Sequence, residues 1–210
     1  AGGKAAGYVT DVSREEQVAD SVRRVEERFG RIDILVNCAG IQRYGTVVDT
    51  SVELWDEVMN VNLKGVFLMC KHVIPVMRKQ QGGAIVNISS VQAFVTQKQV
   101  AAYTASKGAI NALTRAMAVD HAAEGIRVNA ICPASVDTPM LRWAAGLFGG
   151  DVEETVKSWG KAHPIGRVAR ADEIAEAVLF LASDSSSFIT GSELKVDGGT
   201  TSMIAVALPD

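Results

Sequence analysis

Two kinds of apolar pattern alternate along the chain, short β-rich runs and longer stretches with helical spacing. The β-rich runs cover residues 32–37, 84–88, 126–131 and 193–196. Apolar positions three and four residues apart indicate helices over residues 13–28, 51–79, 101–123 and 172–182. Strands that alternate with helices of this length are typical of a parallel sheet covered by helices. The pattern therefore predicts an α/β fold with a doubly wound parallel sheet in three αβα layers, forming a single domain over residues 1–210.

Helix signals and breakers divide this pattern further. Ser13 begins a Ser-x-x-Glu capping box, so the first helix is expected to start there. Gly65 and Pro75 are expected to interrupt the long second helical region. A loop-rich insert is expected over residues 133–170, and its part from about 139 to 170 is predicted to form a substrate lid.

Three β-rich runs lead directly into residues that suit a binding site. Asn37 ends the first run, Ser90 comes two residues after the second, and Pro133 comes two residues after the third. In a doubly wound sheet, ligands bind beyond the carboxyl ends of the strands. We therefore expect these three residues to meet in one crevice.

Tyr103 and Lys107 lie four residues apart in a predicted helix, so their side chains share one helix face. A cation beside a phenol favours the phenolate and lowers a pKa that starts near about 10. A phenol tuned in this way can exchange a proton with an alcohol or a carbonyl. Ser90, thirteen residues before the tyrosine, could bond the same oxygen. A Tyr-x-x-x-Lys pair alone is common on helices, so its neighbours decide whether it is catalytic.

Composition and charge exclude several classes of partner. Of the 210 residues, 48% are hydrophobic and 21% are charged, and the formal net charge is -3. An ordinary, slightly acidic composition gives no reason to expect a nucleic acid or an anionic membrane surface as partner. No apolar run reaches the roughly 18 residues that a membrane-spanning helix requires.

The cysteines and histidines suggest neither disulfides nor a metal. Cys38, Cys70 and Cys132 are far apart and form no Cys-x-x-Cys pair, so we expect buried, reduced thiols in a cytoplasmic protein. The three histidines have no metal-ligand spacing, and no metal site is predicted. His163 is expected to be a surface residue.

Motifs along the whole chain resemble those of the short-chain dehydrogenase/reductase family, in the family's order. They are Asp11-Val12, Asn37-Cys38-Ala39-Gly40, Asn60-Val61-Asn62, Ile88-Ser89-Ser90, Tyr103 with Lys107, Pro133-Ala134-Ser135-Val136-Asp137-Thr138, and Asp197-Gly198-Gly199. The resemblance implies a Rossmann-like fold and an NAD(P)-dependent oxidoreductase. Cys38 stands where the family has a second asparagine, and Ala134 where it has a glycine, so the fine geometry of the cofactor cleft should differ.

The resemblance also implies a role for each matching residue. Tyr103 would be the general acid/base, and Lys107 would lower its pKa and hold the ribose hydroxyls next to the nicotinamide. Ser90 would polarise the reacting oxygen, and Asn62 would hold a water that links Lys107 to solvent. The implied cofactor-binding residues are Asp11, Val12, Asn37, Ala39, Gly40, Tyr103, Lys107, Pro133, Ala134, Val136 and Thr138.

Some of these positions have a purely structural alternative. Asn62 could bend a helix and bond a backbone carbonyl, and Asn37 could tie two strands together. Asp197-Gly198-Gly199 is expected to be a turn rather than a ligand site. Gln92 and Gln97 could contact substrate or only water.

The family's N-terminal βαβ unit is missing from this chain. That unit contains the glycine-rich turn that binds the pyrophosphate at a helix N-terminus. Here Tyr8-Val9-Thr10-Asp11 already resembles the third strand and its following turn. We expect the missing segment to precede Ala1 in the whole protein, because the sheet would otherwise expose apolar faces. The residue that selects the cofactor would lie there, so we expect NAD, with NADP as the alternative.

Three functions agree with these observations. The first is a dehydrogenase that transfers hydride between nicotinamide and a sugar, a polyol or another small hydroxy compound. The second is a 3-oxoacyl-thioester reductase that acts on acyl carrier protein. The third, from another class, is a non-catalytic relative that serves as a binding or scaffold subunit.

A homotetramer is implied by the resemblance. The run Val66-Phe67-Leu68-Met69 and the helix after Lys107 are apolar enough to form subunit contacts. The run of residues 203–208 is apolar for a chain end, and we expect it to dock against a partner subunit.

Overall fold

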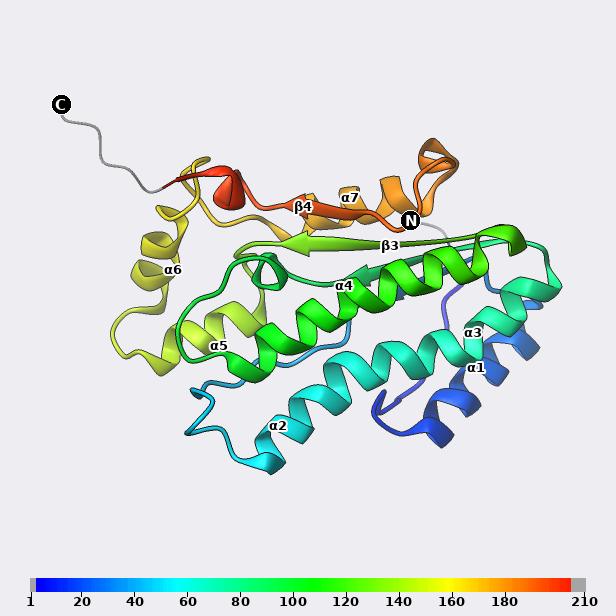
Figure 1. Cartoon of the computed structure of the whole chain (residues 1–210), viewed down its shortest axis with the longest axis horizontal. Coiled ribbons are helices and arrows are strands. Elements are labelled where there is room, and N and C mark those ends of the chain that lie inside the picture. The colour runs from blue at the N-terminus through cyan, green and yellow to red at the C-terminus, as the bar shows by residue number, and fades with distance from the viewer. Residues whose placement is uncertain (1–2, 205–210) are drawn as a thin grey trace.

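The computed structural model describes residues 3–204 and contains a four-stranded parallel sheet in the order β1-β2-β3-β4 (Figure 1). The strands are β1 (Ile34–Asn37), β2 (Gly83–Ile88), β3 (Ile126–Pro133) and β4 (Glu193–Val196). The helices are α1 (Glu15–Phe29), α2 (Val52–Met59), α3 (Gly65–Lys79), α4 (Ala101–His121), α5 (Pro139–Leu147), α6 (Val152–Gly160) and α7 (Ala171–Ala182), with a π-helical turn (Asn60–Lys64) between α2 and α3. The predicted parallel α/β fold is confirmed.

Helices cover both faces of the central strands. Successive side chains of a strand point to opposite faces, and in β2 both Ile85 and Val86 are fully buried. Ile85 belongs to the hydrophobic cluster of α1, α3 and α4, whereas Val86 packs with Ile174 and Leu181 of α7. The sheet therefore lies between α3 and α4 on one side and α7 on the other, which is the predicted three-layer order.

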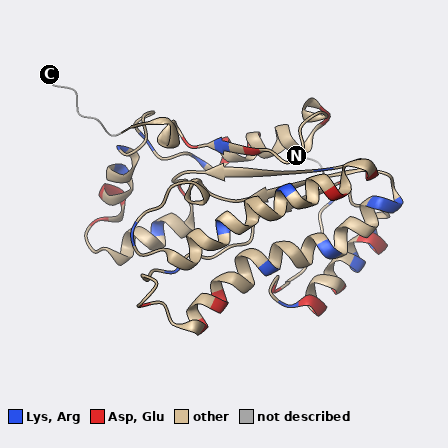
Figure 2. Ribbon diagram, in the orientation of Figure 1, with Lys and Arg blue, Asp and Glu red and all other residues tan. Residues whose placement is uncertain are grey.

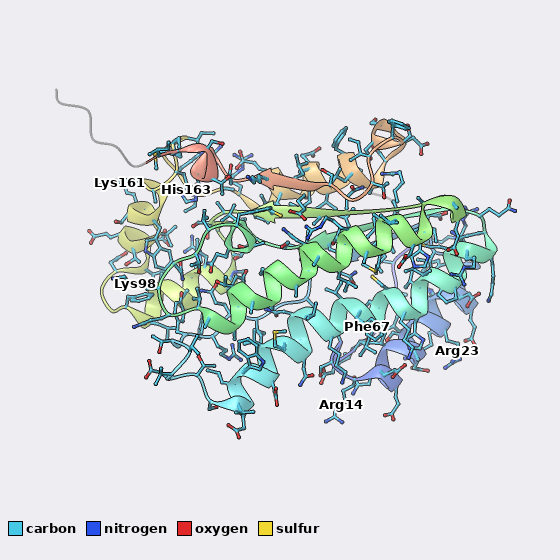
Figure 3. All side chains as sticks on the ribbon, viewed as in Figure 1. Arg14, Arg23, Phe67, Lys98, Lys161 and His163 are labelled. Carbon is cyan, nitrogen blue, oxygen red and sulfur yellow. The ribbon has the colours of Figure 1, made fainter. Side chains whose placement is uncertain are left out.

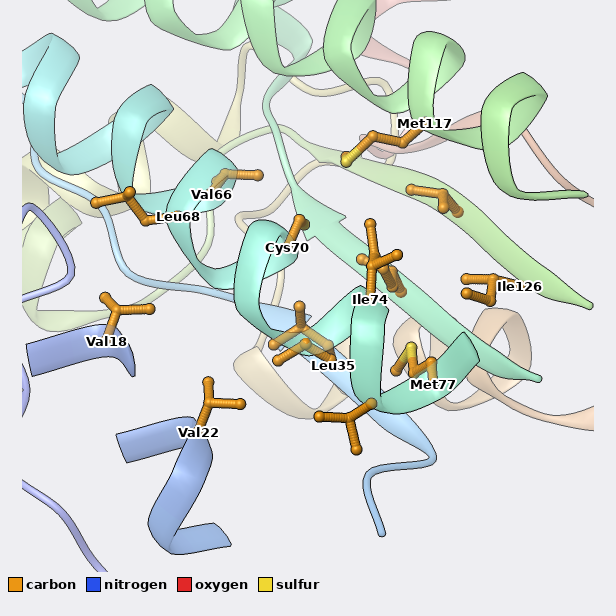
Figure 4. Close-up of a cluster of buried hydrophobic side chains, with 14 of the residues drawn as sticks. Val18, Val22, Leu35, Val66, Leu68, Cys70, Ile74, Met77, Met117 and Ile126 are labelled. Carbon is orange, nitrogen blue, oxygen red and sulfur yellow. The ribbon is translucent and has the colours of Figure 1, made fainter. Parts of the chain in front are cut away.

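The larger cluster lies where α1 and α3 meet the sheet (Figure 4). Val18 and Val22 of α1 face Leu35 of β1, and Met77 of α3 lies beside the strands. Pro75 sits inside α3 without ending it, contrary to the expected interruption. The residues around Pro75 are buried against the sheet, and this packing offsets the backbone hydrogen bond that proline removes.

Strand β1 forms an edge of the sheet in the described residues, and one of its two faces is exposed. β1 pairs with β2 and with no other strand of residues 3–204. Ile34 and Val36, on the face opposite Leu35, are 49% and 41% exposed. The predicted strand over residues 8–11 does not form, because a strand needs a ladder partner and this segment has none among the described residues.

The helices differ from the expected ones at the start of α1 and in the insert after β3. Ser13 does not cap α1: its amide and its hydroxyl both donate to Asp11 Oδ1, at 2.9 and 2.7 Å, and the helix begins at Glu15. The insert expected to be loop-rich contains α5 and α6. Thr138 and Asp151 cap these two helices by accepting hydrogen bonds from backbone N–H groups in their first turns.

Charged side chains lie mainly on the outer faces of the helices (Figure 2). Within residues 3–204, no helix is both long and apolar enough to cross a bilayer. Cys70 and Cys132 are buried free thiols as expected, whereas Cys38 is exposed. The end of the C-terminal run, from residue 205 on, lies outside the described residues, so the expected docking of that run stays a prediction.

Candidate active site

A cleft of about 610 Å³ opens at the carboxyl ends of β2 and β3. Ser90 lines it just after β2, and Pro133 lines it at the end of β3. Tyr103 and Lys107 of α4 form its inner wall. Gly40, from the loop after β1, completes the inner end. Ser90 and Pro133 therefore meet in one crevice as predicted, whereas Asn37 does not line it, because its side chain is bonded to Asn87.

Tyr103 and Lys107 are held firmly on α4. The tyrosine is 8% exposed and the lysine 5%, and the Lys107 Nζ atom lies 5.4 Å from the centre of the Tyr103 ring. The ammonium donates to the backbone carbonyl of Ile88 at 2.8 Å. Ser89 Oγ donates to the Lys107 carbonyl at 3.1 Å. These bonds tie the carboxyl end of β2 to the face of α4 that carries Tyr103 and Lys107.

The pKa of Tyr103 lies above its usual value, contrary to the direction expected from the sequence. Burial raises this pKa to about 12, and a hydrogen bond from Ser90 opposes the rise. Removal of a phenolate from water destabilises it by more free energy than the hydrogen bond from Ser90 restores. In this structure the phenol is therefore a proton donor near neutral pH, and it becomes a base only at alkaline pH.

The same burial acts on Lys107 in the opposite sense. Burial lowers the pKa of its ammonium to about 8, while the Coulombic effect of Cys38 and Cys132 opposes the change. Lys107 therefore carries its charge below about pH 8 and loses it above. An exposed lysine stays charged throughout this pH range, whereas Lys107 does not.

Asn62 lies in the π-helical turn, a geometry that is frequent at functional sites. Its Oδ1 accepts from the backbone N–H of Ile41 at 2.8 Å, and its Nδ2 donates to the Ile41 carbonyl at 2.9 Å. Nδ2 also donates to Ser106 Oγ at 3.1 Å, and Ser106 in turn donates to the Tyr103 carbonyl at 2.7 Å. Asn62 therefore bonds a backbone carbonyl, as its structural alternative predicted. This bond joins the π-helical turn to Ile41 in the loop after β1.

Gly40 keeps the inner end of the cleft open. A Cβ atom at this position would lie 3.4 Å from Asn62 Oδ1 and 3.8 Å from Lys107 Nζ. A side chain there would cover the ammonium, so glycine leaves room for hydroxyl groups of a bound molecule.

The segment after β3 forms the opposite wall. Pro133, Ala134, Val136 and Thr138 all line the cleft. Val136 forms a parallel bridge with Ala169, and Thr138 Oγ1 donates to the Val136 carbonyl at 3.2 Å. The cofactor residues predicted on this side therefore lie together and are held by local hydrogen bonds.

The residues predicted to bind the adenosine half of the cofactor do not all line one cavity. Val12, Asn37 and Ala39 line a second cavity of about 90 Å³. Asn37 Nδ2 donates to Asn87 Oδ1 at 2.8 Å, so its side chain ties β1 to β2, as the structural alternative proposed. Asp11 lines neither this cavity nor the main cleft, and its carboxylate is bonded to Ser13.

His163 is a site residue that the sequence interpretation missed, because it was expected at the surface. It is 6% exposed and lines the cleft. The Ser135 N–H donates to its Nε2 at 3.2 Å, and its Nδ1 lies 3.1 Å from the Trp159 carbonyl. This pattern requires a neutral ring with the proton on Nδ1. His163 thus links the wall after β3 to the end of α6, a contact that no motif or spacing signals.

Replacing His163 by glutamine should weaken cofactor binding by about 3- to 10-fold, and alanine should weaken it more, because only glutamine can still accept a bond from Ser135. Equilibrium titration of nicotinamide nucleotide into both variants checks the order. Exposed Lys161, two residues earlier, is the matched control position, and Lys161→Gln should leave affinity unchanged. Equal affinities for the glutamine and alanine variants would contradict this role for His163.

The outer part of the cleft is lined by residues of the predicted lid, such as Met140 and Trp159, and by Gln92 and Gln97. Contact of these two glutamines with substrate stays a prediction. Tyr44, Phe148 and Trp159 form an aromatic row, with ring centres 5.6 and 6.1 Å apart, and Tyr44 and Trp159 of this row line the cleft. Loop residues far apart in sequence build this wall, so periodicity carries no signal for it.

Known proteins match this chain over most of its length. The family profile described as "Enoyl-(Acyl carrier protein) reductase" matches residues 1–201. The cis-4-hydroxycyclohexanecarboxylate dehydrogenase of Sinomonas cyclohexanicum is 43% identical over 204 residues, which is 97% of this chain and 79% of that protein.

Two solved structures have the same fold. The ligand-free aldohexose dehydrogenase of Thermoplasma acidophilum has a TM-score of 0.94 and 40% identity, and the match covers 100% of this chain and 84% of that one. The gluconate 5-dehydrogenase of Burkholderia cenocepacia J2315, solved with NADP and tartrate, has a TM-score of 0.86 and 38% identity, with coverage of 93% and 75%. The chain belongs to the short-chain dehydrogenase/reductase family of oxidoreductases.

Proposed function

We propose that Asn62, Ser90, Tyr103 and Lys107 form the catalytic set of an NAD(P)-dependent oxidoreductase that interconverts a secondary alcohol and a ketone. The observation that carries the proposal is the meeting of Ser90, Tyr103 and Lys107 in one cleft at the ends of β2 and α4. A phenol, a hydroxyl and an ammonium at one reacting oxygen provide proton transfer and polarisation.

A nicotinamide nucleotide held in this cleft would supply the hydride chemistry. Lys107 would hold the adjacent ribose hydroxyls, and Val136 and Thr138 would hold the carboxamide. The open space beside Gly40 supports this placement. Residues 3–204 contain no glycine-rich turn that joins a strand to a helix, so these assignments concern the nicotinamide half of the cofactor.

The protein's own groups handle the proton. In ketone reduction, the Tyr103 hydroxyl donates its proton to the carbonyl oxygen while Ser90 bonds the same oxygen. In alcohol oxidation, the phenolate takes the hydroxyl proton. Lys107 and Asn62 would return that proton to solvent through a water, and the hydrogen bonds that hold Asn62 beside Ser106 and Ile41 support its position in this path.

The pKa of Tyr103 predicts a difference between the two directions. Because that pKa is about 12, reduction has its acid in place at neutral pH, whereas the phenolate needed for oxidation increases with pH. We expect kcat/KM for oxidation to rise by up to about tenfold per pH unit between about pH 6 and about pH 7.5, where Lys107 keeps its charge, and kcat/KM for reduction to stay nearly constant over the same range. The nicotinamide absorbance, followed with NAD and with NADP over a panel of secondary alcohols and ketones, measures both.

The reduction series in the same buffers serves as the control for this experiment. An oxidation rate independent of pH would contradict Tyr103 as the base. Absence of turnover with every substrate, together with absence of cofactor binding, would favour the non-catalytic scaffold function instead.

Several finer statements belong to this proposal. NAD is the cofactor we propose, and the relative solved with NADP is the reason to assay both. Residues 139–170 are proposed as a lid, since Met140 and Trp159 from its helices line the cleft. A cytoplasmic location is proposed from the free cysteines, and fractionation of the source cells tests it.

A homotetramer is proposed through the outer faces of α3 and α4. Of the apolar run in α3, only Phe67 is strongly exposed, whereas Val66 and Leu68 are buried (Figure 3). Val119 of α4 is also exposed. Light scattering measures the assembly, and Phe67→Glu should dissociate it; an unchanged mass would contradict this surface as the contact.

The named relatives leave the charge of the substrate open. One is named for an aldohexose, and the other two are named for hydroxy acids.

A further inference from the structure

The outer half of the cleft carries no charged side chain among the described residues. Its wall consists of neutral polar and apolar groups, namely Gln42, Tyr44, Gln92, Gln97, Met140 and Trp159. The one charged residue that lines the cleft in residues 3–204 is Lys107. It lies at the inner end, where its ammonium is bonded to the Ile88 carbonyl.

The arginines next to this wall are already paired with carboxylates. Arg43 binds Glu57 through Nη2 and Nε, at 2.7 and 3.1 Å, and its guanidinium lies over the Trp143 ring. Arg142 binds Asp137 at 2.6 Å and also binds Glu153. These cations have their opposite charges beside them, so little of their charge is available to a substrate.

The nearby lysines do not line the cleft. Lys98 lies in the loop before α4 and Lys161 at the end of α6, and both are exposed (Figure 3). The sequence of residues 205–210 contains no lysine or arginine. An anionic group in the outer cleft would therefore gain no cationic partner among these residues, and it would exchange part of its water for neutral side chains.

The missing cationic partner should discriminate between charged and uncharged substrates. An ionised carboxylate removed from water without a partner is penalised far more than a neutral polar group that finds a hydrogen bond. Side-chain amides offer both donors and acceptors, so Gln42, Gln92 and Gln97 suit hydroxyl, carbonyl and amide oxygens. Met140 and Trp159 offer apolar surface for a carbon skeleton.

We propose that the substrate is an uncharged hydroxy or keto compound, and that this cleft discriminates against hydroxy acids and other anions. The proposal rests on the proposed function, because it takes this cleft as the substrate site. It separates neutral sugars, polyols and cyclic alcohols from sugar acids and from acyl groups attached to a phosphopantetheine, whose phosphodiester is anionic.

The test uses pairs of compounds that differ by one charge. Each pair contains a hydroxy acid and its primary amide, for example cis-4-hydroxycyclohexanecarboxylate and cis-4-hydroxycyclohexanecarboxamide. Turnover by the full chain with NAD or NADP gives kcat/KM for each member. Quenching of tryptophan fluorescence, to which Trp159 in the cleft contributes, gives the affinity whether or not turnover occurs. We expect the amide to be favoured by about 100-fold in kcat/KM.

A variant that adds the missing charge sharpens the test. Gln92→Arg should raise kcat/KM for the acid by about tenfold and lower the amide-to-acid ratio accordingly. Gln92→Met, of similar length and without charge, should not raise activity toward the acid. Lys98→Gln, outside the cleft, should leave the ratio unchanged.

The outcomes separate this proposal from the proposed function. Tighter binding of the amide without turnover of either compound would contradict the oxidoreductase function and support the charge discrimination. Equal or tighter binding of the acid would overturn the charge discrimination even if both compounds were turned over. Binding of neither member of any pair would also overturn it.

Discussion

Tyr103→Phe should lower turnover by about 10²- to 10⁴-fold, while nicotinamide nucleotide still binds with nearly unchanged affinity. The substitution removes only the hydroxyl that donates or accepts the substrate proton. The ring is buried on α4, and phenylalanine fills the same space, so stability should change little. Initial rates in both directions and a cofactor titration measure the two effects separately.

Tyr44→Phe is the matched control for this substitution. Tyr44 lines the same cleft, and burial raises the pKa of its hydroxyl as it does for Tyr103. Its hydroxyl is bonded to Gln97 and has no proposed part in proton transfer, so its loss should lower turnover by less than about tenfold. Full activity in the Tyr103 variant, or an equal loss in both variants, would refute Tyr103 as the acid/base.

Lys107→Met should reduce both catalysis and cofactor binding, with a loss in kcat/KM of about 10²- to 10³-fold. Methionine fills much of the buried stem without leaving an unpaired charge, so the effect reports the missing ammonium. Because the pKa of Lys107 is about 8, the native protein should bind cofactor more weakly as pH rises through about 8, when the ammonium is lost. In the methionine variant this decrease should disappear.

Cofactor titration between about pH 6 and pH 10, a range that includes the Lys107 pKa of about 8, measures the difference. Lys157→Met, at an exposed position of α6, should retain the native affinity and its pH dependence. A native affinity that does not fall with pH, or one that falls equally in the Lys107 variant, would contradict the assignment of the ammonium to the cofactor.

Much of the fold was predictable because the strands carry a strong local signal. β2 and β3 are apolar on both faces and bounded by glycine or polar residues, and the predicted runs overlap the observed strands closely. The helices α5 and α6 were not predicted, because glycines around residue 150 suggested a loop. Their starts depend on capping by Thr138 and Asp151, short side-chain contacts that residue counts alone do not reveal.

The direction of the Tyr103 pKa also could not be read from spacing. Four residues on a helix place a cation near the phenol, and from this the sequence predicts a lowered pKa. The structure adds burial at the meeting of β2 and α4, and this burial raises the pKa of Tyr103 more than the hydrogen bond from Ser90 lowers it. Spacing determines which groups are neighbours, whereas solvent exclusion depends on every segment that covers them.

By itself, the sequence determined the parallel α/β fold, the family resemblance and the group of Ser90, Tyr103 and Lys107 at the strand ends. These depend on periodicity and on short motifs, which are local properties of a chain. Only the tertiary structure decided that His163 is buried and that the outer cleft is uncharged. Both features arise where loops distant in sequence pack together, so they depend on contacts that local pattern does not encode.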